Sequence, residues 1–197
     1  MYVDKRLSFA RIFSKIFLKI IGWKAEGIKP DAPKYVMIGY PHTSNWDFPI
    51  GLMVMTALGI KLRWIGKDSL FHGPRGWLLK LLRGIPVNRS VSSNFVDNTI
   101  NVFRENKEMV IVIAPEGTRS YTEFWRTGFY YIALGAGVPV LLGFMDYSCK
   151  TGGVGPLFYP TGNIDQDLAE IRKFYAGKTG KFPEKMGKIK ARPRPAS

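Results

Sequence analysis

A histidine and an aspartate five positions apart in the segment GYPHTSNWDFP have the residue types of a general base and its orienting acid. His42 follows a predicted strand, and the next three residues, 43–45, are types that favour helix N-caps. Asp47 therefore falls in the first turn of a helix, where its carboxylate can reach one imidazole nitrogen and leave the other free to accept a proton. The same spacing also occurs by chance, and a helix dipole alone favours an acid in the first turn.

No serine lies in a G-x-S-x-G turn of the kind that presents a nucleophile. A base without a partner nucleophile on the enzyme would act on a hydroxyl group of the substrate. We therefore interpret His42 as a candidate base for a substrate hydroxyl.

A second polar segment follows directly from an apolar strand, because MVIVIAPEGTRS runs from the predicted strand into residues 115–120. Ligands bind at strand ends of α/β sheets, and Gly117 lets the backbone approach a ligand closely. Backbone amides together with Arg119 and Ser120 could hold an anionic group. Upstream, Arg89 in GIPVNRS ends another predicted strand. A turn-forming glycine and surface arginines would explain these residues singly, but explain them less well together.

In this order, HTSNWD, GIPVNR, PEGTRS and GVPV resemble the four sequence blocks of the glycerolipid acyltransferase family, which contains the lysophosphatidic acid acyltransferases. The resemblance covers roughly residues 35–145, and HTSNWD with PEGTRS is its specific part. It implies that His42 is the general base and that Asp47 orients it. It also implies that the acceptor is bound by residues of the second and third blocks, namely Arg89, Glu116, Gly117, Thr118, Arg119 and Ser120.

The resemblance further implies an O-acyltransferase similar to 1-acylglycerol-3-phosphate O-acyltransferases. Such an enzyme takes a fatty acyl group from acyl-CoA or acyl-carrier protein to a lysophospholipid or glycerol-phosphate-type hydroxyl, with no metal or other cofactor. Two departures concern the seating of the acceptor: Pro86 stands where the second block usually has phenylalanine, and Gly143 lies near the place of a missing proline in the fourth block. The alternative is a non-catalytic membrane-surface lipid-binding protein on the same fold, which the presence of both His42 and Asp47 argues against.

Short apolar runs alternate with helical patterns through the middle of the chain. Strands are predicted at 35–40, 61–66, 84–88, 109–114 and 138–145, and helices at 45–58, 76–82, 92–106, 127–136 and 165–175. This alternation predicts a single α/β domain over residues 25–176, with a mostly parallel or mixed central sheet flanked by helices.

The formal charge of +14 is concentrated at the two ends of the chain. Residues 1–24 carry a net +5 and residues 177–197 a net +6, which leaves +3 for the long middle. The body thus lacks a basic stripe, and we expect no nucleic-acid partner but an anionic membrane surface or an acidic carrier. Glycine, proline and lysine dominate residues 177–197, which we predict to be a basic flexible tail.

Residues 1–24 predict an amphipathic helix that lies in a membrane interface. Apolar residues recur at three- and four-residue steps from Phe9 to Ile21, and Arg11, Lys15 and Lys19 recur every four residues on the opposite face. A helix packed in the core, or a mitochondrial presequence, would show a similar pattern. Since no apolar run approaches the roughly 20 residues that span a bilayer, we expect a peripheral, monotopic protein on the cytoplasmic face of a membrane. The single cysteine, which allows no intramolecular disulfide, suits this setting.

Overall fold

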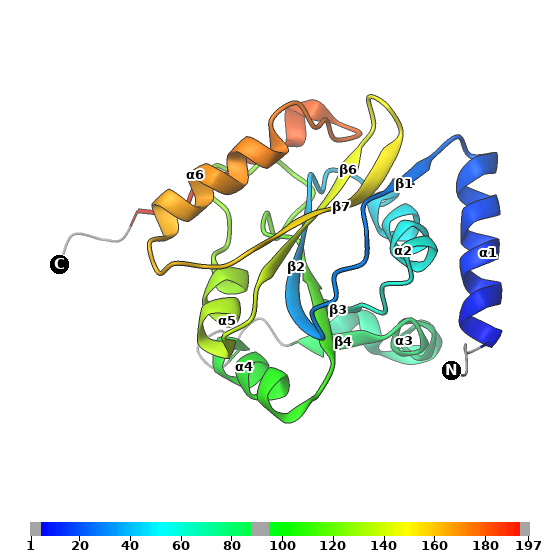
Figure 1. The fold of residues 1–197 in the computed structure, drawn as a ribbon, viewed down its shortest axis with the longest axis horizontal. Helices are drawn as coiled ribbons and strands as arrows, with labels where there is room; N and C mark the ends of the chain where they lie inside the picture. The colour runs from blue at the N-terminus through cyan, green and yellow to red at the C-terminus, as the bar shows by residue number, and fades with distance from the viewer. Residues whose placement is uncertain (1–4, 88–94, 194–197) are drawn as a thin grey trace.

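The computed structural model describes residues 5–87 and 95–193, and these ranges contain one seven-stranded sheet with the order β1-β7-β6-β2-β5-β3-β4 (Figure 1). The strands are β1 Lys24–Glu26, β2 Lys34–Tyr40, β3 Arg63–Lys67, β4 Gly84–Val87, β5 Met109–Ile113, β6 Val140–Asp146 and β7 Thr151–Phe158. The α-helices are α1 Lys5–Ile20, α2 Asp47–Leu58, α3 Gly73–Leu81, α4 Phe95–Glu105, α5 Gly128–Ala136 and α6 Ile164–Tyr175.

The sheet is mostly parallel, which confirms the predicted α/β fold. Strands β6, β2, β5, β3 and β4 run in one direction, β7 is antiparallel to β6, and β1 is parallel to β7. Helices α1, α2 and α3 lie on one side of the sheet and α4, α5 and α6 on the other (Figure 1). The five strands predicted from apolar runs are all present, and none of their ends shifts by more than two residues.

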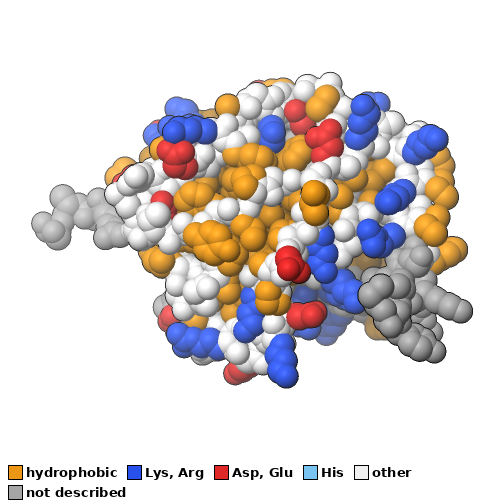
Figure 2. All heavy atoms as spheres, viewed as in Figure 1, with side chains coloured by type: hydrophobic (Ala, Val, Ile, Leu, Met, Phe, Trp, Pro, Cys, Tyr) orange, Lys and Arg blue, Asp and Glu red, His pale blue; other side chains and the backbone are white. Residues whose placement is uncertain are grey.

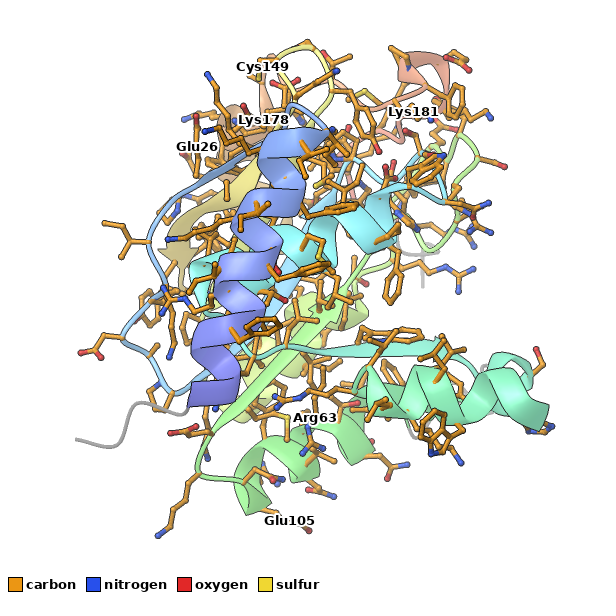
Figure 3. All side chains as sticks on the ribbon, turned by 90° about the vertical axis from the view of Figure 1, so that its right-hand side faces the viewer. Glu26, Arg63, Glu105, Cys149, Lys178 and Lys181 are labelled. Atoms are coloured by element: carbon orange, nitrogen blue, oxygen red, sulfur yellow. The ribbon has the colours of Figure 1, made fainter. Side chains whose placement is uncertain are left out.

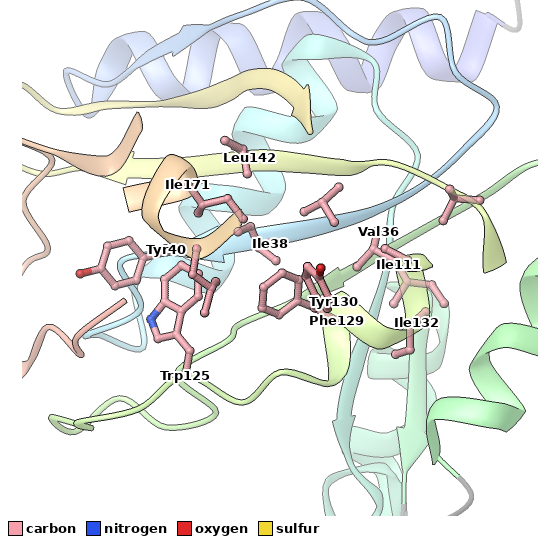
Figure 4. Packing of buried hydrophobic residues seen from close by; sticks show 14 of the residues in the cluster. Val36, Ile38, Tyr40, Ile111, Trp125, Phe129, Tyr130, Ile132, Leu142 and Ile171 are labelled. Atoms are coloured by element: carbon pink, nitrogen blue, oxygen red, sulfur yellow. The ribbon is translucent and has the colours of Figure 1, made fainter. Parts of the chain in front are cut away.

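Two hydrophobic cores form because the side chains of each strand alternate between the two faces of the sheet. In β2, Val36 and Ile38 pack with α4, α5 and α6, whereas Tyr35 and Met37 pack with α1 and α2. Figure 4 shows the first of these cores, where Phe129 of α5 lies among the β2 and β5 side chains. An apolar run without alternation in polarity is therefore what a central strand covered on both faces requires.

Two strands, β1 and β7, were not predicted from the sequence. The β7 segment TGGVGPLF contains glycine and proline, which are poor strand formers. The structure explains Gly153, because a Cβ atom there would lie 2.1 Å from the backbone oxygen of Glu26 in β1. Glycine thus permits the close approach of β1 and β7. Because glycine is a poor strand former, the same residues hid β7 from prediction by sequence.

The predicted flexible tail does not hold for residues 177–193, here called the C-terminal strap. The Tyr40 hydroxyl donates a hydrogen bond of 3.0 Å to the Gly187 carbonyl. Ile189 is buried, and its carbonyl accepts two hydrogen bonds from the Arg172 guanidinium. The prediction was wrong because backbone hydrogen bonds to distant segments leave no trace in composition. The residues after 193 lie outside the described range.

The surface of helix α1 has three parts: a buried face, a cationic face and an exposed apolar face. Ser14 and Leu18 are buried against the body of the protein, and the Ser14 hydroxyl lies 3.5 Å from the Met53 sulfur of α2. Figure 3 shows α1 lying in front of α2. The remaining surface carries the exposed cations Arg11, Lys15 and Lys19, and a row of large apolar side chains that are 38–77% exposed: Phe9, Ile12, Phe13, Ile16, Phe17 and Ile20.

The apolar row of α1 therefore does not pack into the core of this chain. In Figure 2 it forms the right-hand edge of the molecule, with Lys and Arg side chains beside it on the face toward the viewer. Within the described ranges, α1 and the other helices are all too short or too polar to cross a membrane.

Candidate active site

The two polar segments singled out in the sequence meet at one edge of the sheet. Strands β2 and β5 are parallel neighbours, with Ile38 paired to Ile113 near their carboxyl ends. The chain leaves β2 toward His42 and leaves β5 toward residues 115–120, so both loops emerge at the same edge. This is the edge at which α/β folds bind ligands.

His42 and Asp47 form a hydrogen-bonded pair at this edge. The imidazole Nδ1 lies 3.2 Å from Asp47 Oδ2, and the two side chains are 28% and 5% exposed respectively. Helix α2 begins at Asp47, two residues later than the helix predicted from residue 45. Because Nδ1 faces the carboxylate, Nε2 is the ring nitrogen left to accept a proton.

The Asp47 carboxylate is held by further hydrogen bonds. The backbone amides of Thr43 and Ser44 each donate to Oδ2 at 2.8 Å, and the Tyr147 hydroxyl donates to Oδ1 at 2.7 Å. Burial by itself raises the pKa of Asp47, but the hydrogen bonds from His42, Tyr147 and the Ser44 amide outweigh burial and lower the pKa below its usual value. The carboxylate is thus ionised at neutral pH, the state that stabilises an imidazolium beside it.

Glu116 lies behind the backbone of His42 and is only 2% exposed. Its Oε2 accepts a hydrogen bond of 2.6 Å from the His42 amide, and its Oε1 accepts one of 2.9 Å from the Gly187 amide. One side chain thereby ties the β5 loop to the His42 loop and to the C-terminal strap. The family resemblance associates Glu116 with binding of the acceptor, but both of its carboxylate oxygens accept hydrogen bonds from the protein backbone.

Burial raises the pKa of Glu116 to about 7, although the Gly187 and His42 amides act in the opposite direction. In the unfolded chain this carboxyl titrates near 4.5. We expect the stability that depends on Glu116 to be fully present below pH 4.5 and to be lost as the pH rises to about 7, because the unfolded state releases the proton first. The difference corresponds to about 3 kcal/mol of unfolding free energy.

Urea unfolding of the wild type and of Glu116→Gln across this pH range measures that dependence. Glutamine cannot ionise, and its NH2 group would face a backbone amide, so the variant should be less stable at low pH and approach the wild type as the pH rises. Parallel pH profiles for the two proteins would contradict the prediction.

The loop after Glu116 presents the other predicted binding residues. Gly117 adopts a φ of 66°, a left-handed conformation that residues with a side chain rarely adopt, so glycine is favoured at this turn. Thr118, Arg119 and Ser120 are exposed. The Arg119 guanidinium donates a hydrogen bond to the Asn45 side-chain oxygen, which brings this cation to the His42 loop.

The structure thus brings together His42, Asp47 and residues 116–120. Arg89 lies outside the described residues and stays a prediction. Two supporting residues outside the predicted site were missed: Tyr147, 100 residues from Asp47, and Phe182, whose amide donates to the Thr43 hydroxyl across 139 residues. No local pattern could have indicated either. In the described ranges no group of three or more His, Cys, Asp and Glu side chains has a metal-binding arrangement.

Comparison with known proteins gives two matches. The family model for acyltransferases matches residues 28–141, a range that includes both loops of the site. The fold is similar to the crystal structure of the 1-acyl-sn-glycerophosphate (LPA) acyltransferase PlsC from Thermotoga maritima, with a TM-score of 0.59 and 17% identity over 91% of this chain and 86% of that chain. At this identity the likeness concerns the fold. No curated protein sequence matches the chain.

Proposed function

The chain belongs to the glycerolipid acyltransferase family, and on that premise we propose that it moves a fatty acyl group from acyl-CoA or acyl-carrier protein to a hydroxyl of a lysophospholipid or glycerol-phosphate-type acceptor. The observation that carries the proposal is the His42–Asp47 pair. The buried, ionised carboxylate of Asp47 contacts Nδ1 of the partly buried imidazole, so that Nε2 can accept a proton from a substrate. Residues 25–176 would form the catalytic domain, to which the strap adds the Gly187 amide.

In the proposed mechanism His42 Nε2 takes the proton of the acceptor hydroxyl while the hydroxyl oxygen attacks the thioester carbonyl. Asp47 stabilises the imidazolium that forms. The tetrahedral intermediate then collapses, the carbon–sulfur bond breaks, and the imidazolium returns the proton to the leaving sulfur. Because a thioester is already reactive, most of the remaining rate gain would come from holding the two substrates in place.

Incubation of the full chain with radiolabelled acyl-CoA or acyl-carrier protein and a panel of acceptors tests this function. The acceptor named for the similar solved enzyme, 1-acyl-sn-glycerophosphate, is the first to include. Labelled phospholipid is the expected product. Vesicle binding without product from any donor and acceptor pair would instead favour the non-catalytic lipid-binding alternative.

Arg119 is proposed to bind the acceptor phosphate, because this exposed cation lies at the His42 loop. Arg119→Ala should raise the acceptor KM about ten- to a hundredfold and leave the donor KM unchanged, since a charge-assisted hydrogen bond is worth about 1.5–3 kcal/mol. Arg104→Ala is a matched control, because Arg104 is also exposed and contacts an asparagine, Asn101, on α4. A rise in the donor KM would reassign Arg119.

We propose that α1 docks the enzyme on the cytoplasmic face of an anionic membrane. Its exposed apolar row can enter the interface, and Arg11, Lys15 and Lys19 lie beside that row where headgroups would be. A cleft of about 720 Å³ lies between α1, β1 and the end of α2. It is lined by these three cations and also by Lys24 and Lys29. This cationic surface supports an anionic lipid as the preferred partner.

Replacing Phe13 and Ile16 together with glutamine should lower the affinity for anionic vesicles at least about tenfold, because each buried side chain contributes about 1.5–3 kcal/mol when it leaves water. Both residues are exposed, so the fold should survive, and activity on a detergent-dispersed acceptor should persist. Leu134→Gln on α5, 41% exposed, is the control. Equal vesicle binding by the double variant and the control would exclude α1 as the docking element.

A further inference from the structure

Tyr147 reaches the active-site carboxylate from the turn that joins β6 to β7. Its hydroxyl lies 2.7 Å from Asp47 Oδ1, while the His42 ring and the Thr43 and Ser44 amides all contact the other oxygen, Oδ2. Tyr147 therefore holds the end of the carboxylate that faces away from the histidine.

Tyr147 is itself held in place from two directions. Its ring packs edge-to-face against Trp23 at a centroid distance of 4.8 Å, and its amide donates a hydrogen bond of 2.8 Å to the Thr179 carbonyl in the C-terminal strap. Trp23 is buried directly after α1, and its amide donates to the Leu18 carbonyl. The hydroxyl of Tyr147 is thus positioned by two segments that are distant from it in sequence.

The hydroxyl also stays protonated. Burial raises the pKa of Tyr147, and the hydrogen bond to the Asp47 carboxylate raises it further. Tyr147 is consequently a donor to Asp47 throughout the pH range in which the protein would work.

We propose that Tyr147 is a positioning residue for the His42–Asp47 pair, an inference that rests on the proposed function. The terminal torsion of an aspartate side chain is broad, so a carboxylate held only through Oδ2 can rotate away from the imidazole. The hydrogen bond to Oδ1 fixes the carboxylate plane and thereby the direction in which Oδ2 meets His42 Nδ1. Imidazole orientation then depends on a residue that touches neither substrate nor histidine.

Tyr147→Phe tests this inference, because it keeps the ring against Trp23 and removes only the hydroxyl. We expect kcat to fall roughly tenfold, as for loss of one hydrogen bond to a charged group, with both KM values within about twofold of the wild type. Tyr35→Phe is the control, since the buried Tyr35 hydroxyl has no hydrogen-bond partner within the described residues. It should leave kcat unchanged.

Nitrogen-15 NMR of the His42 ring gives a second readout that does not need turnover. The chain has two histidines, so His72→Ala assigns the signals. The wild type should show one tautomer with the proton on Nδ1, and Tyr147→Phe should show a mixture. Unchanged kcat or an unchanged tautomer in a folded Tyr147→Phe protein would overturn the inference. Absence of labelled product from every donor and acceptor pair would overturn the proposed function instead, and the tautomer measurement would still decide the role of Tyr147.

Discussion

Replacing His42 with alanine is expected to lower kcat for acyl transfer by a factor on the order of 10²–10⁴, the contribution of a general base that acts in the rate-determining step. The imidazole is the side chain that we assign to proton removal, and Asp47 already faces its Nδ1. A steady-state assay with saturating donor and acceptor measures the loss.

The fold should survive this change. The His42 side chain is partly exposed, and the hydrogen bond to Glu116 comes from its backbone amide, which alanine retains. Asp47 also keeps its bonds from Thr43, Ser44 and Tyr147, so no buried charge is left without donors. Thermal unfolding of the variant should therefore resemble that of the wild type. His72→Ala, which removes the other histidine, should retain near-normal turnover, and near-normal turnover by His42→Ala itself would refute the mechanism.

The second large effect is expected at Asp47. Asp47→Asn should lower kcat by about 10³-fold, with little change in either KM, because the neutral amide no longer stabilises the imidazolium that forms beside it. The asparagine oxygen can still accept from the Thr43 and Ser44 amides, and its NH2 group can donate to the Tyr147 hydroxyl. The loop should therefore keep its shape, so that the loss in kcat reports the missing negative charge.

Asp167→Asn is a matched control for this variant. Asp167 is another buried aspartate that accepts a tyrosine hydroxyl, from Tyr130 at 2.7 Å, and a backbone amide, from Thr161 at 2.7 Å. It lies in α6 and, among the described residues, its carboxylate bonds to Tyr130 and Thr161 and not to the candidate site. We expect it to lower the unfolding free energy and leave kcat intact. If Asp47→Asn behaved in the same way, Asp47 would only be a residue that stabilises the start of α2.

The amino-acid sequence alone predicted the elements whose signals are local. The runs that became β2, β5 and β6 are apolar over consecutive residues, because central strands are covered on both faces. The pairing of His42 with Asp47 was also predictable, since only five positions and one strand-to-helix corner separate them. Parallel pairing of β2 and β5 then brings Arg119 to the same edge, as expected for strand ends in this fold class.

The face of α1 that contacts the body shows the limit of such patterns. Periodicity separated apolar from cationic residues, but it did not indicate that Ser14 and Leu18 would be the buried positions. Ser14 and Leu18 are buried because α2 packs against them, and the position of α2 cannot be read from the spacing of residues in α1.

The tertiary structure alone decided which groups support the His42–Asp47 pair. Glu116 engages the His42 and Gly187 amides, and Tyr147 engages Asp47 from 100 residues away. The C-terminal strap, rich in glycine and lysine, is ordered by backbone hydrogen bonds whose partners lie elsewhere in the chain. A backbone amide is the same group in every residue except proline, so a bond to it leaves no mark on residue type. Sequence therefore determined which residues could do the chemistry, and only folding determined which groups hold them in position.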